Sequence, residues 1–83
     1  MCRNITILRG LDPPASDEEI EAAARQYVRK VSDVRSTSPA TEEAFERAVA
    51  LVAQATSELL RELPARRRTP PTAPPLRRRA ASQ

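Results

Sequence analysis

Apolar side chains recur at helical spacing in two stretches of this chain, and that pattern constrains the fold more than any other feature. In the first stretch the apolar positions are Ile20, Ala23, Ala24, Tyr27, Val28 and Val31. A stripe with this spacing is typical of an amphipathic helix that buries one face. Ser16 and Glu19 form a capping-box pattern, in which each side chain accepts a free backbone N–H. The sequence therefore predicts a helix over 17–32, with Tyr27 in the core.

The second stretch follows a polar loop, Ser32–Ala40, whose serine, threonine and proline residues favour turns. Thr41 stands where an N-cap is expected, and two glutamates follow it in the first turn. The apolar stripe beyond them is wide, which predicts a well-buried helix over 42–62. Pro64 is expected to end it, because proline lacks the N–H that the helix needs.

Residues 4–9 have no decisive pattern, because Ile5 and Ile7 alternate as in a strand while Ile5 and Leu8 share a helical face. Two amphipathic helices joined by a short loop make an antiparallel hairpin, and its wide second helix needs further apolar cover. We interpret residues 4–9 as a short first helix, capped by Asn4, that packs across the hairpin. The expected fold is all-α.

The last twenty residues differ in composition from the rest. Six of the fourteen basic residues and none of the eleven acidic residues lie in 64–83, where Leu76 is the largest hydrophobe. The net charge of +3 therefore comes from this segment. We expect a small helical domain over 1–63 and a disordered, proline- and arginine-rich basic tail over 64–83.

Two arginine triplets in the tail are candidate polyanion-binding residues. They are Arg66, Arg67 and Arg68, and Arg77, Arg78 and Arg79, separated by a proline-rich spacer that is expected to be extended. Such triplets can pair with phosphates in a salt-sensitive, sequence-independent way. The alternative is a tail that only keeps the protein in solution.

Cys2 is the only cysteine, and the chain contains no histidine. An intrachain disulfide is therefore excluded. After removal of Met1, the amine and thiol of Cys2 could chelate a soft metal, and Arg3 would favour the thiolate. A single thiol does not complete a metal site, so Cys2 remains a weak candidate beside the simpler reading of a small terminal residue.

The candidate partner-binding residues lie at two places. Arg3 and Asn4 could bind an anion or a partner's backbone, and Arg25, Arg29 and Lys30 form a basic edge on the first long helix. The alternatives are that Asn4 only caps a helix and that the basic edge is a solvated face.

The frame from Leu11 to Leu60 resembles a J-domain. Ala15–Ile20 is similar to the start of that family's second helix, and Glu42–Phe45 to the start of its third. In the family a His-Pro-Asp tripeptide follows the second helix and triggers ATP hydrolysis by a partner chaperone. Ser32-Asp33-Val34 stands at that place. The resemblance therefore implies the fold and argues against stimulation of a chaperone ATPase.

A second resemblance is to small uncharacterised bacterial proteins, a family of unknown function frequent in actinobacteria. It rests on the opening Met1–Ile5 and on the stretches Gln26–Ser32 and Phe45–Val49. We expect it to span residues 1 to about 62 and to leave out the tail. It implies no particular activity.

These features favour a non-enzymatic, cytoplasmic protein-interaction module whose basic tail binds polyanions weakly. No cofactor is expected, and no histidine or glycine-rich loop indicates an enzyme. No apolar run has the roughly 20 residues that a membrane span needs. The alternatives are a Cys2-dependent redox or metal-binding protein and a nucleic-acid-associated protein acting through the arginine triplets. Whether the protein forms a homo-oligomer is left open.

Overall fold

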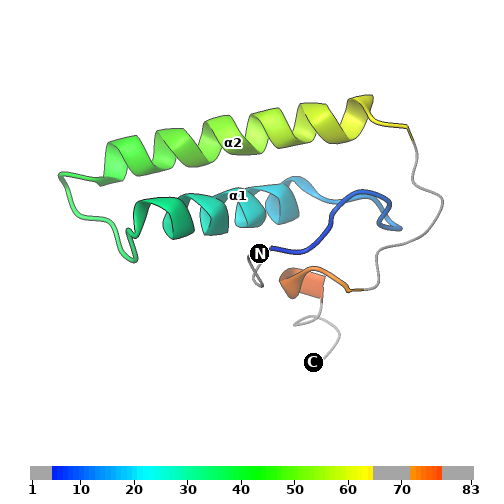
Figure 1. Cartoon of the computed structure of the whole chain (residues 1–83), viewed down its shortest axis with the longest axis horizontal. Coiled ribbons are helices and arrows are strands. Elements are labelled where there is room, and N and C mark those ends of the chain that lie inside the picture. The colour runs from blue at the N-terminus through cyan, green and yellow to red at the C-terminus, as the bar shows by residue number, and fades with distance from the viewer. Residues whose placement is uncertain (1–4, 65–71, 78–83) are drawn as a thin grey trace.

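A computed structural model describes residues 5–64 and 72–77, and these residues form an all-α fold without strands. Helix α1 spans Asp17–Ser32 and helix α2 spans Glu42–Glu62. They lie side by side as an antiparallel hairpin (Figure 1). Both long helices are confirmed with the bounds that the sequence predicts. No helix in the described ranges is long and apolar enough to cross a membrane.

Helix α1 begins at the predicted capping box. The Glu19 N–H donates to Ser16 Oγ at 3.1 Å, and the Ser16 N–H donates to Glu19 Oε1 at 2.8 Å. The helix ends at Asp33, which adopts the left-handed conformation with φ 57°. That conformation is common at helix C-termini, because it turns the chain away from the helix axis.

Helix α2 begins differently from the prediction. Thr41 precedes the helix, but among the described residues its side chain makes no capping hydrogen bond to the helix. Thr41 Oγ1 instead accepts the Ser38 N–H at 2.9 Å, while the Ser38 carbonyl accepts the Thr41 and Glu42 N–H groups. The threonine hydroxyl is therefore used to close the turn before the helix, and its backbone carbonyl accepts the Phe45 N–H at 3.0 Å.

The core lies between the two helices. Ala24 and Val28 of α1 pack with Phe45 and Val49 of α2, and all four are buried. Four partly buried residues surround this cluster: Val34, Ala48, Val52 and Ala53. At the other end of the hairpin, Leu11 and Ile20 are also buried.

Only part of the apolar stripe on each long helix is buried. On α1 the i, i+4 row of Ile20, Ala24 and Val28 is buried, but Tyr27 is 47% exposed and Val31 is also exposed. The prediction of a core Tyr27 is therefore wrong. The prediction of a well-buried second helix is also wrong, because Leu51 and Leu59 are exposed by 60% and 54%. Within residues 5–64 and 72–77, the segments outside the two helices leave these side chains exposed.

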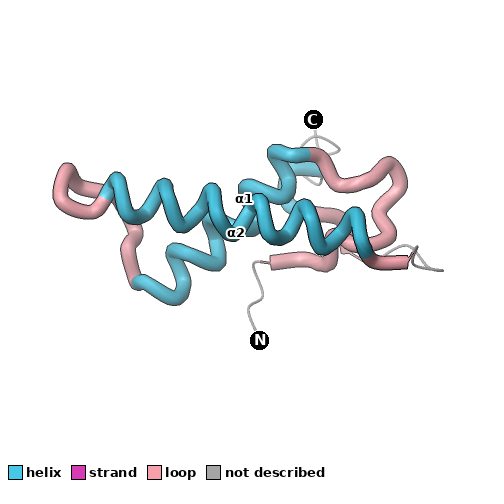
Figure 2. The backbone as a smooth tube through the Cα atoms, turned by 90° about the horizontal axis from the view of Figure 1, so that it is seen from above, coloured by secondary structure: helices cyan, strands magenta, loops and turns pink. Residues whose placement is uncertain are grey.

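The predicted helix over 4–9 is wrong in its described part. Residues 5–8 carry no helix, Arg9 and Gly10 form a turn, and Asn4 lies outside the described residues. The segment appears as loop in Figure 2. A helix this short is unstable by itself, and Ile5, Thr6 and Ile7 are β-branched and disfavour it further. Gly10, with φ 88°, then turns the chain so that Leu11 reaches the core.

The prediction of a disordered tail is wrong for residues 72–77. Pro74 is buried, and Pro75–Arg77 form one helical turn in which the Arg77 N–H donates to the Pro74 carbonyl at 3.0 Å. This turn lies beside the N-terminal segment, below α1 in Figure 1. Residues 65–71 and 78–83 lie outside the described residues, so the prediction stays untested there.

Candidate functional site

An apolar groove runs between the N-terminal segment and the two helices. Its volume is about 420 Å³, and it is lined by residues 5–9, by Ala23, Ala24 and Tyr27 of α1, by Val52, Thr56, Leu59 and Leu60 of α2, and by Leu63, which follows α2. Ile7, Tyr27 and Leu59 line it and are each about half exposed. Thr56 donates its hydroxyl to the Val52 carbonyl at 2.7 Å, which satisfies that polar group locally. The lining is therefore almost entirely apolar.

Arg9 ties the N-terminal segment to the end of α2. Its Nε and Nη2 donate to the Pro64 carbonyl at 3.2 and 2.7 Å. The Pro64 carbonyl, just beyond the helix, accepts both hydrogen bonds, and this contact holds Arg9 at one side of the groove. The groove is therefore held by a long-range polar contact as well as by apolar packing.

A second surface receives the guanidinium group of Arg77. Arg77 Nε donates to Glu19 Oε2 at 2.7 Å, and Arg77 Nη2 donates to Glu19 Oε1 at 3.1 Å. Nη2 also donates to the carbonyls of Pro13 and Pro14 at 2.6 and 3.2 Å. We call Glu19 and these two carbonyls the arginine socket. It joins positions 58 residues apart in the sequence.

Glu19 is the buried charge of the socket, with a side chain only 5% exposed. Burial raises the pKa of Glu19, but the Ser16 N–H, the Arg77 guanidinium and the Ser16 hydroxyl together outweigh it and lower the pKa below its usual value. The carboxylate is therefore ionised near neutral pH. It takes part in the capping box and in the ion pair simultaneously.

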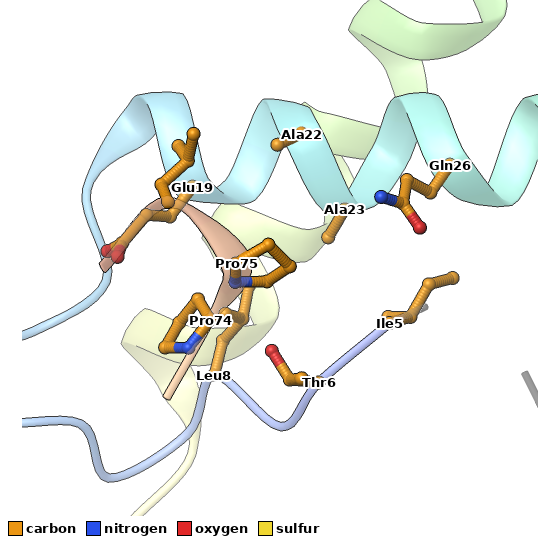
Figure 3. A pocket seen from close by; sticks show the side chains of 10 residues that line it. Ile5, Thr6, Leu8, Glu19, Ala22, Ala23, Gln26, Pro74 and Pro75 are labelled. Carbon is orange, nitrogen blue, oxygen red and sulfur yellow. The ribbon is translucent and has the colours of Figure 1, made fainter. Parts of the chain in front are cut away.

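Beside the socket, the residues before Arg77 rest on α1. Pro74, Pro75 and Leu76 line a pocket of about 40 Å³ together with Ile5, Thr6, Leu8, Ala22 and Ala23. Figure 3 shows the two prolines beneath α1, with Leu8 and Thr6 next to them. Gln26 also lines this pocket, and its buried Oε1 has no hydrogen-bond partner among residues 5–64 and 72–77.

Arg25, a predicted partner-binding residue, is held by the protein's own side chains. It donates to Glu46 Oε2 and Oε1 at 2.7 and 2.8 Å and to Glu21 Oε1 at 3.3 Å, and it lies 5.7 Å from the centre of the Phe45 ring. The hydrogen bond from Arg25 lowers the pKa of Glu46, and the same pairing raises the pKa of Arg25. The Arg25 side chain therefore joins α1 to α2.

Of the other predicted site residues, the structure describes Arg29, Lys30 and Arg77. Arg29 and Lys30 are exposed on α1. Cys2, Arg3, Asn4, Arg66, Arg67, Arg68, Arg78 and Arg79 lie outside the described residues. Of the tail arginines, Arg77 alone is described, and it occupies the socket. Within residues 5–64 and 72–77, no three metal-ligating side chains lie close enough together to hold an ion.

Sequence reasoning missed both the groove and the socket. The capping box explained Glu19 locally, which hid its second partner. One signal was available: Leu76, the largest hydrophobe of the tail, directly precedes an arginine. The groove had no comparable signal, because apolar residues recur at the same helical spacing whether they are buried or exposed.

Comparison with known proteins gives one match. A family model described as an uncharacterized conserved protein (DUF2277) matches residues 1–83. The match includes the tail, so the expectation that the resemblance stops near residue 62 is wrong. No curated protein and no solved structure matches the chain.

Proposed function

The chain belongs to the DUF2277 family of uncharacterized conserved proteins, and we propose that its helical hairpin is a non-enzymatic protein-interaction module that binds a partner through the apolar groove. The observation that carries this proposal is the grouping of Ile7, Tyr27 and Leu59, all about half exposed, around one groove. Large apolar side chains gathered on the surface of a small protein mark interaction sites.

The occupant of the groove is an amphipathic helix of the partner, with aliphatic side chains on one face. The groove is lined by apolar side chains, and Thr56 already donates its hydroxyl within α2. An extended peptide would bring unpaired backbone N–H and C=O groups into such a groove, whereas a helix satisfies them internally. Lys30 follows Tyr27 by three residues and Glu62 follows Leu59 by three, which places opposite charges near the lining.

The basic tail adds polyanion affinity to this module. Its arginines can pair with phosphates, and Arg77 must first leave Glu19 to do so. The J-domain resemblance is supported by the hairpin alone, because residues 5–8 do not form that family's first helix. With Ser32-Asp33-Val34 after α1, chaperone ATPase stimulation is not proposed. The proposed compartment is the cytoplasm, on the single cysteine.

The groove is tested by comparing three variants of the full chain: Tyr27→Glu, Leu59→Glu and Leu51→Glu. Leu51 is the matched control, because it is as exposed as Leu59 but lies outside the groove lining. Far-UV circular dichroism first checks that each variant is folded. Affinity capture followed by mass spectrometry then compares the bound proteins.

We expect the same partner to be captured by the wild-type chain and by Leu51→Glu, and to be lost with both groove variants. Capture that survives Leu59→Glu and Tyr27→Glu contradicts the proposal. Binding by the purified partner can be followed directly, since Tyr27 is the only tyrosine and the chain has no tryptophan. A partner peptide without aromatic residues should change the fluorescence of Tyr27 when it binds.

A further inference from the structure

The tail segment Pro74–Arg77 sits on the body as a peptide ligand sits on its receptor. Pro74 is buried, Pro75 and Leu76 are partly buried, and the Arg77 side chain is 25% exposed. The receptor surface is made by other parts of the chain, from the N-terminal segment and α1. It lies beside the apolar groove and shares Ile5, Leu8 and Ala23 with it.

The polar half of this surface selects arginine. The carboxylate of Glu19 takes two parallel N–H groups of the guanidinium, and the carbonyls of Pro13 and Pro14 accept from Nη2. Lysine has no planar fork and could not match this set of acceptors. The charge-assisted, two-point pairing gives strength as well as orientation.

The apolar half of the surface favours apolar residues with a rigid backbone, such as proline. Ala22 and Ala23 have short side chains, which leave room beside α1. The two prolines and Leu76 can therefore lie close to the helix backbone. Proline also has little backbone freedom to lose on docking. The order Pro-Pro-Leu-Arg therefore fits the surface in both of its halves.

We propose that Glu19, the Pro13 and Pro14 carbonyls and the Ala22–Ala23 side of α1 form a recognition site for a Pro-Pro-Leu-Arg peptide, with residues 74–77 as its intramolecular ligand. This site is distinct from the helix-binding function of the groove and stands without it. Tethering keeps the local concentration of the ligand in the millimolar range, so the site is filled in the free protein. A partner with the same motif gains access when the tail is drawn away.

The site is tested with a fluorescein-labelled peptide, Thr-Ala-Pro-Pro-Leu-Arg, and the full chain carrying Arg77→Glu. The substitution places a negative charge opposite Glu19 and displaces the tail. We expect saturable binding by fluorescence anisotropy, at least tenfold tighter than to the wild-type chain, whose own tail competes. The same peptide with lysine for arginine should bind at least tenfold more weakly.

A second substitution separates the socket from the cap. Glu19→Gln in the Arg77→Glu chain keeps an N3 side chain that can complete the capping box but removes the charge. Binding of the peptide should be lost. Equal binding with and without the Glu19 charge, or no binding to a folded Arg77→Glu chain, overturns the proposal. Dimers of the wild-type chain that disappear in Arg77→Glu would support it, with the tail of a second copy as the peptide.

An NMR measurement on the single variant Arg77→Gln serves if the charge reversal prevents folding. Backbone amide signals of Ser16, Ala22 and Ala23 should shift relative to the wild-type chain, because the Ser16 N–H donates to Glu19, the partner of Arg77, and the two alanines line the pocket beside the tail. Signals around Phe45 should stay in place. Unchanged signals at all three positions would mean that the tail does not occupy the site.

Discussion

The two ends of the hairpin differ in whether their ion pair is buried. Next to the interhelical loop, an apolar cluster around Phe45 and Val49 is buried, and the ion pair between Arg25 and Glu46 lies at the surface. At the open end, Leu59 is exposed while Leu11 and Ile20 are buried, and the ion pair is buried as well, with the Glu19 side chain only 5% exposed. Both ion pairs use two hydrogen bonds, so their geometry is alike and their burial differs.

This difference assigns separate roles to the two halves. The loop half follows the usual rule that burial of apolar surface drives folding. The open half leaves such surface uncovered and uses a buried charge to hold a distant segment, which is what a binding surface needs. We therefore expect substitution of the buried Phe45 to act mainly on stability, and substitution of the exposed Leu59 to act mainly on binding.

The largest effect is expected for Phe45→Ala. Phe45 is 6% exposed, and removal of a buried phenylalanine costs about 3–5 kcal/mol, close to the whole stability of a domain this small. Urea unfolding followed by circular dichroism measures it. Leu59→Ala is the control at the open end and should cost less than about 1 kcal/mol, because its side chain is already half exposed. Equal losses would show that both halves are packed alike.

The next effect is expected for Glu19→Ala. It removes the capping-box carboxylate and leaves Arg77 without its partner, at a cost of about 2–3 kcal/mol. Ser16→Ala is the comparison, since it removes one capping acceptor and keeps the ion pair, for about 1 kcal/mol. Urea unfolding of both variants is the measurement. A Glu19→Ala loss no greater than that of Ser16→Ala would contradict a stabilising role for Arg77.

The same pair predicts a pH dependence. The pKa of Glu19 is lower in the folded protein than the roughly 4.3 of an unfolded glutamate, so its stabilising effect is complete above that value and is lost as the pH falls through the folded pKa. The wild-type chain should exceed Arg77→Gln in stability at pH 7, and this difference should shrink as the pH falls below about 4. A difference that is constant from pH 7 to pH 3 contradicts the pairing.

The smallest effect is expected for Arg25→Lys. The Glu46 side chain is half exposed, so water competes for the pair, and the loss of stability should be smaller than that of Ser16→Ala even though the two-point contact and the stacking on Phe45 are both weakened. Thermal unfolding at low and high salt measures it. A loss comparable to that of Glu19→Ala would remove the contrast between the two ion pairs.

Local signals in the sequence were sufficient for the helices. The capping box at Ser16 and the spacing of Ile20, Ala24 and Val28 correctly predict α1, because both depend on residues within four positions of each other. The bounds of α2 follow in the same way. The capping box and the apolar spacing each lie within a single helix, so both can be recognised in the sequence alone.

Local signals were insufficient wherever a distant segment decides the outcome. Tyr27 shares the spacing of the buried residues but is half exposed, because the segments within residues 5–64 and 72–77 cover it only in part. Residues 5–8 lack a helix, since their contacts come from α1, α2 and the tail instead of from one another. The Glu19–Arg77 pair spans 58 positions, and nothing in the capping pattern distinguishes a glutamate with a second partner from one without.

The backbone conformation at Gly10 is one that a D-residue adopts more easily than an L-residue. It is the only glycine of the chain, and its φ of 88° is strained for an L-residue with a β-carbon. The turn it makes sends Leu11 into the interior while Arg9 reaches Pro64. A chain of 83 residues is within reach of chemical synthesis, and D-alanine at this position would keep the turn that L-alanine opposes. The path of the N-terminal segment thus depends on a residue without handedness.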